Sequence, residues 1–293
     1  MGEVEHLNAT TSSETVETRQ RTGSLVERFV EYALTLSLTG LRTFGRSLQL
    51  ATSSIRYLVV DVVRLRHPWR ETVVQCWFIA TVTAIPAVLV SVPFGVIVSV
   101  QVGSLTQQVG ASSVAGAAGG LGVIRQGAPI VAALLLGGAA GSAVAADLGA
   151  RTVREEIEAL RTMGIDPSRR LVAPRLAAMA ILAPLLCMLI IFMGLSAGYF
   201  INVVFQGGTP GSYISSFSSF ASLTDLYVAL AKSMIFGVIV IVVACQRGLE
   251  AKGGPKGVAD AVNASVVIGV VAAFGVNLVL TQLVSMFLPT KVG

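Results

Sequence analysis

The sequence predicts an all-α integral membrane protein: five transmembrane helices, an amphipathic helix in the membrane interface before them, and a cytosolic helix between the second and third spans. Two observations carry this fold class. Of the 293 residues, 54% are hydrophobic and only 13% are charged, whereas soluble domains carry about a quarter charged residues. In addition, five apolar segments each reach roughly the 20 residues that a helix needs to cross a bilayer.

The region before the first span divides into two parts. Residues 1–24 are rich in Ser, Thr and Glu and have no apolar core, so we expect a disordered cytosolic tail rather than a signal peptide. In residues 25–72, Leu34, Leu38 and Leu41 recur at three- and four-residue steps with Arg on other faces. This pattern predicts an amphipathic helix in the membrane interface. A cytosolic helix packed on the rest of the protein is the alternative.

The apolar runs predict the positions of the spans. They cover Val73–Val102, the segment from Arg125 to Leu148, and then Leu171–Val204, Leu226–Cys245 and Ala264–Leu288. The first span is expected to kink or tilt, because two prolines lie inside it. Residues 103–122 are rich in Gly, Ser and Ala, and we expect them to form a loop on the far side, with a partly re-entrant path as the alternative.

The distribution of Lys and Arg predicts the orientation. These residues gather before the first span, after the second and after the fourth, whereas the loops 103–122 and 206–225 contain none. Because cytoplasmic loops retain Lys and Arg, we expect an inner (plasma) membrane protein with a cytosolic N-terminus and an external C-terminus. The same bias explains the net charge of +5 better than binding to nucleic acid does, since the basic residues flank apolar spans.

The sequence predicts no catalytic or metal site of its own. It contains no HExxH motif and no recognisable Ser, His and Asp set. Cys76, Cys187 and Cys245 have no CxxC spacing, so we interpret them as small buried hydrophobic residues. The phosphate-binding pattern GxxxxGK[ST] is also absent from the sequence. The chain is therefore not expected to bind a cofactor or to hydrolyse ATP by itself.

The charged segment 151–175 lies between two of the most apolar runs of the chain. Within it, Val153, Ile157 and Leu160 form an apolar ridge opposite a charged face, which predicts a short helix. Gly164 is expected to end that helix as a C-cap residue. A cytosolic helix with an exposed charged face can dock a soluble partner, and a solvated connector that only fixes topology is the alternative.

This segment resembles the signature of the MlaE/YrbE permease family. The resemblance extends over about residues 25–288 and includes the LRTFGR sequence at Leu41–Arg46. Its most specific part follows the second span. The matching residues there are Asp147, Leu148, Gly149, Glu155, Ile157, Ala159, Leu160, Met163, Gly164, Ile165, Asp166, Pro167, Leu171, Val172, Pro174 and Arg175.

The resemblance implies a function and its partners. Similar proteins are transmembrane subunits of ABC transporters that move lipids between envelope membranes, working as permease dimers with a cytosolic ABC ATPase and MCE-domain proteins. Residues 73–288 would then be the permease domain, with a coupling helix at about 151–168 that receives the ATPase. The coupling surface would consist of Glu155, Glu156, Glu158, Arg161, Met163, Gly164, Asp166, Pro167 and Arg170.

The chain also departs from the family pattern. Gln126 replaces an acidic residue, and Ala139 and Arg151 replace an Arg and a Met. The sequence resembles actinobacterial systems with two unequal permeases, so we expect a heterodimer with a paralogue and import of a lipid. The lipid-binding residues would be Phe94, Val98, Gln101, Leu105, Arg125 and Gln126, with Arg125 near a headgroup or carboxylate. Ordinary helix packing or snorkelling is the alternative for these residues.

Other function classes remain open at the level of the sequence. An ion-coupled lipid or drug transporter would need no ATPase, but Arg125, Asp147 and Lys232 lie toward the ends of the expected spans, which disfavours an ion relay in mid-membrane. A membrane subunit that only anchors MCE proteins is a second alternative. An intramembrane enzyme lacks a nucleophile and a base in the sequence.

Overall fold

The computed structural model describes residues 45–58, 60, 68–110 and 114–287. The chain divides into two units, residues 1–49 and 50–293. Residues 45–49 of the first unit are helical, as are residues 50–58 and 60 of the second. The expected tail and most of the expected interfacial helix lie outside the described residues. All that follows concerns the second unit.

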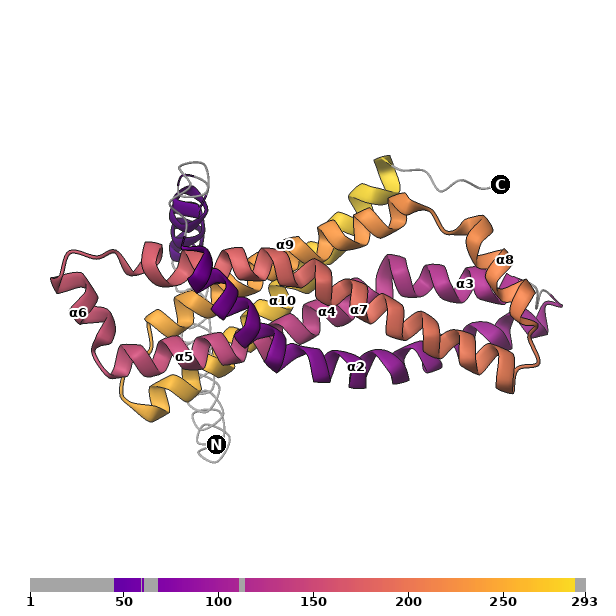
Figure 1. The fold of residues 1–293 in the computed structure, drawn as a ribbon, viewed down its shortest axis with the longest axis horizontal. Coiled ribbons are helices and arrows are strands. Elements are labelled where there is room, and N and C mark those ends of the chain that lie inside the picture. The colour runs from indigo at the N-terminus through magenta and orange to yellow at the C-terminus, as the bar shows by residue number, and fades with distance from the viewer. Residues whose placement is uncertain (1–44, 59, 61–67, 111–113, 288–293) are drawn as a thin grey trace, which may run out of the picture. The chain divides into compact units, whose positions relative to one another are not determined.

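The structure confirms the all-α membrane fold. Within the described residues every regular element is a helix, and five helical segments are long and apolar enough to cross a membrane. The first, fourth and fifth are single helices: α2 (Trp69–Gln108), α9 (Leu223–Leu249) and α10 (Pro255–Phe287). The third joins η4 (Ser168–Val172) to α7 (Ala173–Phe205). α7 lies between α2 and α9, and α9 packs against α10. Figure 1 shows these helices running along the long axis of the bundle.

The second span is a composite of α- and π-helical turns. It runs through α3 (Ala115–Gly122), η2 (Val123–Gly127), α4 (Ala128–Leu135), η3 (Leu136–Ala140) and α5 (Gly141–Val153). It therefore begins at Ala115, ten residues before the expected start. A run of glycines favours a loop by propensity, but Gly116 and Gly120 here lie directly against Tyr213 and Phe217 of another helix. Close packing in the membrane overrides the local preference.

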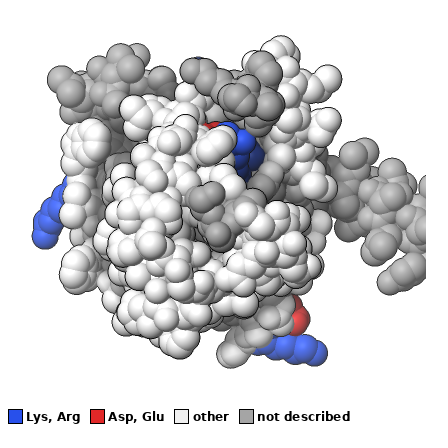
Figure 2. Space-filling view, turned by 90° about the vertical axis from the view of Figure 1, so that its right-hand side faces the viewer, with Lys and Arg blue, Asp and Glu red and all other residues white. Residues whose placement is uncertain are grey.

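Two shorter helices lie at opposite ends of the bundle. α6 (Glu156–Thr162) follows the second span, and α8 (Pro210–Phe220) precedes the fourth. The α8 helix falls in a segment that the sequence analysis treated as a loop. Figure 2 views the α8 end, where most of the visible surface is uncharged and one group of charged side chains lies inside a recess. The two ends of the bundle are thus different in chemistry.

Close backbone contact joins the first and third spans. The buried residues of α2 recur at every fourth position, as Ala87, Ser91, Gly95, Ser99 and Gly103 do. A Cβ atom on Gly95 would overlap the carbonyl oxygen of Gly194 in α7, and Ser99 Oγ donates to the Gly198 carbonyl at 3.0 Å. Small residues allow this approach, which dispersion and polar contacts stabilise in lipid.

The second and fourth spans form the centre of the bundle. In the most apolar 18 residues of each of these two spans, about two thirds of the residues are buried, whereas only about one fifth are buried in α2 and α10. Leu136, Leu148 and Ile241 are fully buried there. The outer spans α2 and α10 each bury one narrow stripe and leave wide apolar faces exposed. Such faces are the expected surfaces for lipid or for another membrane helix.

Candidate functional site

The loop between the second and third spans forms the candidate site. In Figure 1 it projects beyond the bundle at the end opposite α8, with α6 as its outermost helix. α5 ends at Val153, α6 spans Glu156–Thr162 and η4 begins at Ser168. The predicted single helix of about 151–168 is therefore the end of α5, a sharp turn, the short helix α6 and a second turn. This break turns α6 away from the axis of the second span.

The turn depends on an unusual backbone conformation at Glu155. Its φ of 62° lies in the left-handed region, and among the described residues it is the one non-glycine residue with a positive φ. An L-residue other than Gly pays about 1 kcal/mol or more for this conformation. Its amide donates to the Thr152 carbonyl at 3.1 Å, and its carbonyl accepts from the Ala159 amide at 3.0 Å. The tight connection into α6 holds the strained residue in place.

α6 buries Ile157, half-buries Leu160 and exposes its other residues, whereas Val153, expected on the same apolar ridge, lies in α5 and is exposed. Ile157 is buried, whereas Glu156, Glu158 and Arg161 are exposed. An ion pair joins Arg154 to Glu156 at 3.0 Å across the turn. The predicted coupling residues that are exposed are Glu155, Glu156, Glu158, Arg161, Met163, Gly164, Asp166 and Arg170. Pro167 is buried, because it leads into η4 against the bundle, so it does not contribute surface.

The C-terminal end of α6 follows the predicted glycine cap. Gly164 has a φ of 74°, its amide donates to the Arg161 carbonyl, and the Ile165 amide donates to the Leu160 carbonyl. These two hydrogen bonds together are a Schellman motif, which satisfies carbonyls that the helix end would otherwise leave free. The Ser168 amide then donates to the Asp166 carboxylate at 2.9 Å. The loop is therefore ordered by local hydrogen bonds on both sides of α6.

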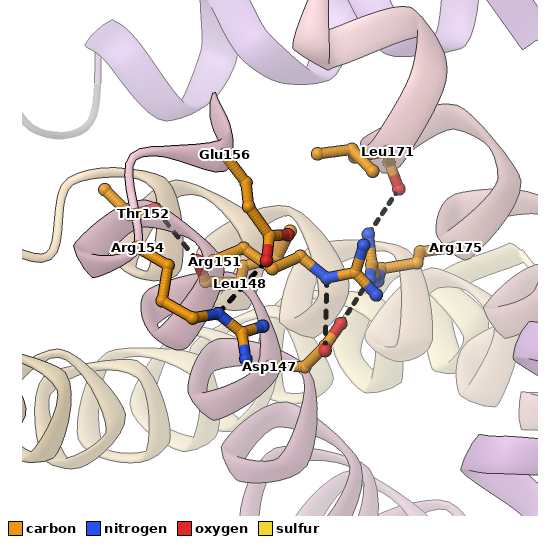
Figure 3. Close-up of polar contacts among 8 residues, drawn as sticks. All are labelled: Asp147, Leu148, Arg151, Thr152, Arg154, Glu156, Leu171 and Arg175. Carbon is orange, nitrogen blue, oxygen red and sulfur yellow. Dashed lines mark hydrogen bonds and ion pairs between the residues drawn. The ribbon is translucent and has the colours of Figure 1, made fainter. Parts of the chain in front are cut away.

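Asp147 joins the two ends of this loop (Figure 3). One carboxylate oxygen accepts from Arg151 Nε at 3.2 Å, and the other accepts from Arg175 Nη2. Arg175 is 1% exposed and also donates to the Leu171 carbonyl at 2.8 Å. A buried guanidinium requires a charged partner, so the Asp147–Arg175 pair fixes the start of the third span against the end of the second.

Small residues bring the fourth and fifth spans to the same place. A Cβ atom on Gly248 of α9 would lie 2.7 Å from Leu148 Cβ, and one on Gly149 would lie 3.1 Å from Val258 of α10. Thr152 Oγ1 donates to the Gly248 carbonyl at 3.0 Å. Four of the five spans therefore meet below α6, which allows a force on that helix to reach all of them.

A second ion pair lies toward the α8 end. Arg125, in the π-helical turn η2, donates to the two carboxylate oxygens of Asp225 at 2.8 and 3.2 Å. Asp225 also closes a capping box with Ser222 at the start of α9. The sequence analysis placed Arg125 at the end of a span and near a lipid headgroup. The structure places it ten residues inside the second span and gives it a carboxylate partner within the chain.

The other predicted lipid-binding residues divide between two environments. Phe94 and Val98 are half-buried, and a Cβ atom on Gly127 would overlap the Phe94 ring. Gln101, Leu105 and Gln126 are exposed. Val98 borders a small cleft between α2, α3, α7 and α8, and the cleft is lined in addition by Gly95, Ser99, Ala115, Gly119, Val123, Gly194, Leu195, Gly198 and Tyr213.

Tyr213 is the aromatic residue of that cleft. Its ring packs edge-on against the ring of Tyr199, with the two centroids 5.5 Å apart. Burial raises the pKa of its phenol above the usual value. The hydroxyl is therefore protonated at neutral pH and is a neutral part of the helix packing.

Sequence reasoning missed three features of these sites. Asp225 was not recognised as the partner of Arg125, although the Ser222-x-x-Asp225 spacing is a capping-box signal at the start of a helix. Asp147 and Arg175 were matched to the family pattern but were not expected to touch each other. The left-handed backbone of Glu155 has no signal in the sequence, because Gly or Asn is the usual residue there.

Comparison with known proteins agrees with this architecture. The family model described as Permease MlaE matches residues 72–283. A probable ABC transporter permease protein of Synechocystis sp. is 33% identical over 189 residues, which is 64% of this chain and 72% of that protein. Protein TRIGALACTOSYLDIACYLGLYCEROL 1, chloroplastic, of Arabidopsis thaliana is 26% identical over 225 residues, or 77% of this chain and 64% of that protein.

A third relative carries the family's own name. The intermembrane phospholipid transport system permease protein MlaE of Haemophilus influenzae is 32% identical over 164 residues, which is 56% of this chain and 63% of that protein. The matches to the Arabidopsis and Haemophilus proteins thus span somewhat less than two thirds of their lengths. Because the family model covers most of the present sequence, including α6, the whole of three spans and nearly all of the first and fifth, the chain belongs to the MlaE permease family.

Proposed function

We propose that this chain is the transmembrane permease subunit of an ATP-driven lipid transporter of the cell envelope. The observation that carries the proposal is α6, an exposed charged helix whose base is joined to the second, third and fourth spans by Asp147, Arg175 and Thr152. The named relatives are ABC transporter permeases, and one belongs to a phospholipid transport system. This agreement supports transport of a lipid rather than of a small polar solute.

α6 is the proposed docking surface for a cytosolic ABC ATPase. Its exposed carboxylates and Arg161 offer charged contacts, and the Asp147–Arg175 pair makes the loop rigid enough to transmit a push. Electrostatic complementarity at such a surface sets partner choice and orientation. In this proposal the α6 end faces the cytosol of the inner membrane, the N-terminus is cytosolic, and ATP is bound by the partner.

The remaining partners follow from the same proposal. A second MlaE-type permease, a paralogue in the actinobacterial arrangement, would pack in the membrane, and MCE-domain proteins would bring lipid to the far side for import. The wide apolar faces of α2 and α10 leave room for the second permease. The proposed lipid wall remains Phe94, Val98, Gln101 and Leu105 of α2 with Gln126 of the second span, since Phe94 packs against Gly127, and Gln101, Leu105 and Gln126 are exposed.

Charge reversal in α6 tests the proposal. The double variant Glu155→Lys/Glu158→Lys is expected to insert normally but to lose co-purification of the ATPase and ATP-dependent lipid transport in reconstituted vesicles. Asp260→Lys is the matched control, because Asp260 is an exposed carboxylate near the start of α10, outside the α6 loop. It is expected to leave assembly and transport intact.

Two results would overturn the proposal. One is normal assembly and transport by the α6 double variant. The other is transport that proceeds without nucleotide under a proton gradient, which is the behaviour of an ion-coupled transporter. An anchor for MCE proteins would bind them but would show no nucleotide-dependent transport in either condition.

A further inference from the structure

Lys232 is a buried basic residue inside the fourth span. It lies nine residues after the start of α9 and is 4% exposed. At 1.5 Å per residue this places it about 14 Å along the helix, which is about one third of the way along the 27 residues of α9. An ionisable side chain at such a position is costly in a membrane and marks a functional site by default.

The polar partners of Lys232 are neutral. Its ammonium group donates to Thr281 Oγ1 in α10 at 2.9 Å, and Thr281 in turn lies 3.5 Å from the Asn277 amide oxygen. Asn277 is buried as well. An ammonium group has three protons to donate. Within the described residues, one of these three protons is used in a side-chain hydrogen bond, the one to Thr281.

The acidic residues nearest along the spans are already engaged or are distant. Asp225 lies seven residues before Lys232 in the same helix, about 10 Å away along its axis, and both of its oxygens accept from Arg125. Asp147 is held by Arg151 and Arg175. Asp260 lies 21 residues before Thr281 in α10, about 31 Å along that helix. No carboxylate of the described spans therefore forms an ion pair with Lys232.

The packing between α9 and α10 changes from apolar to polar at Lys232. Toward the α6 end, Val240 lies against Gly269, and Phe236 packs with Ala273 in a dry apolar cluster. One turn closer to the α8 end, Lys232 of α9 contacts Thr281 of α10, and Thr281 contacts Asn277 within α10. The buried stripe of α10 consists of small or polar residues, namely Ala261, Ser265, Gly269, Ala273 and Asn277. Movement of α10 away from α9 at the α8 end of the bundle would therefore make Lys232, Thr281 and Asn277 accessible. The apolar contact of Phe236 with Ala273 would lie directly next to them, on the side of the α6 end.

We propose that Lys232, together with Thr281 and Asn277, binds the anionic headgroup of the transported lipid when α10 moves away from α9. This inference rests on the proposed function and adds a substrate class, namely amphiphiles that carry a carboxylate or a phosphate. The headgroup supplies the negative charge that the chain does not, and Thr281 and Asn277 donate to its oxygens. The apolar contact of Phe236 with Ala273 limits how far the headgroup can move between the two helices toward the α6 end. In the closed form, Thr281 holds the Lys232 side chain in its place.

The proposal is tested by lipid binding to the whole transporter complex in detergent. Three probes are compared: oleate, phosphatidylglycerol and the uncharged monooleoylglycerol. Lys232→Met, which keeps the apolar length of the side chain, is expected to weaken binding of at least one anionic probe by roughly tenfold or more, equivalent to about 1.4 kcal/mol. Binding of monooleoylglycerol is expected to stay unchanged, and Lys232→Arg to retain much of the anion binding.

The matched control separates headgroup binding from a structural role. Lys256→Met removes an exposed lysine near the start of α10, at the other end of that helix from Thr281, and is expected to retain anion binding. Thr281→Val removes one donor to the headgroup but leaves the Lys232 charge, so it is expected to weaken anion binding less than Lys232→Met does. A selective loss for oleate assigns a carboxylate, a selective loss for phosphatidylglycerol assigns a phosphate, and a loss for both assigns either anion. If Lys232→Met fails to insert, Lys232→Gln provides the same comparison.

Two outcomes would overturn the inference: equal loss of all three probes, or unchanged binding of both anions. ATPase co-purification, measured in parallel, keeps this result independent of the proposed function. Lys232→Met is expected to retain the ATPase, because the residue lies far from α6. Failure of the α6 charge reversal to release the ATPase would count against the coupling surface and not against Lys232.

Discussion

Asp147 and Arg175 are 28 residues apart in the sequence and form an ion pair at the base of the α6 loop. Asp147 is one third exposed, whereas Arg175 is almost completely buried. Their contact joins the end of the second span to the start of the third, within about two helical turns of the loop on each side. The proposed docking of an ATPase on α6 would need such a connection, because a flexible base would absorb the motion.

Removal of the Asp147 charge is expected to destabilise the protein strongly. Asp147→Asn leaves the buried Arg175 guanidinium without a countercharge, which typically costs about 3 kcal/mol or more. Arg151→Met is the matched control, since it removes only the more exposed partner of Asp147 and is expected to cost about 0.5 kcal/mol. Thermal unfolding of the two purified variants in the same detergent measures the difference. Equal melting temperatures would contradict the structural role of Arg175.

The left-handed conformation of Glu155 predicts an unusual substitution pattern. Glu155→Asn and Glu155→Val both remove the charge, but Asn tolerates a positive φ whereas a β-branched residue does not. We therefore expect the Val variant to be less stable than the Asn variant by about 1 kcal/mol. Thermal unfolding of the two variants in detergent is the measurement. A Val variant as stable as the Asn variant would show that the turn relaxes.

The ion pair between Arg125 and Asp225 predicts energetic coupling between the second and fourth spans. Arg125→Gln and Asp225→Asn each leave the other charge unpaired, and each is expected to cost about 2 kcal/mol. The double variant should cost clearly less than the sum of the two, which a double-mutant cycle on unfolding temperatures detects. Additive effects would mean that the pair is not formed in the membrane. Ser222→Ala serves as a control that removes only the helix cap.

The close approach of α2 and α7 predicts a strong effect of a single methyl group. Gly95→Ala would place a Cβ atom onto the Gly194 carbonyl, and overpacking of this kind typically costs about 1–3 kcal/mol. Gly275→Ala is the control in another span, because its Cβ would meet no atom within 4 Å, and it is expected to be neutral or slightly stabilising. Yield and melting temperature of both variants are the readouts. An unaffected Gly95→Ala protein would exclude the tight contact.

The proposed orientation is testable with single cysteines. Met163 is exposed in the α6 loop and Ser218 is exposed in α8, at the two ends of the bundle. A membrane-impermeant maleimide added to right-side-out spheroplasts is expected to label Ser218→Cys, and to label Met163→Cys only after permeabilisation. The unaltered protein controls for Cys76, Cys187 and Cys245, which are half-buried or buried. The reverse labelling pattern would place α6 outside and would contradict ATPase docking there.

The sequence by itself determined the features that depend on local pattern. Apolar runs long enough to span a bilayer predict five spans, since a helix in lipid must satisfy its own backbone and present apolar side chains. Gly164 predicts the end of α6, because few other residues adopt a positive φ at a C-cap. The Asp147-to-Arg175 pattern was sufficient to suggest the family, which the family model then confirmed.

Only the tertiary structure decided which distant groups meet. Arg125 and Asp225 are 100 residues apart, and Lys232 and Thr281 are 49 residues apart, so no periodicity relates them. The start of the second span at Ala115 likewise depends on α8 packing against Gly116 and Gly120. The physical reason is the same in each case. Propensity and hydropathy act along one helix, whereas the charges and glycines of a membrane bundle take their roles from the neighbouring helix.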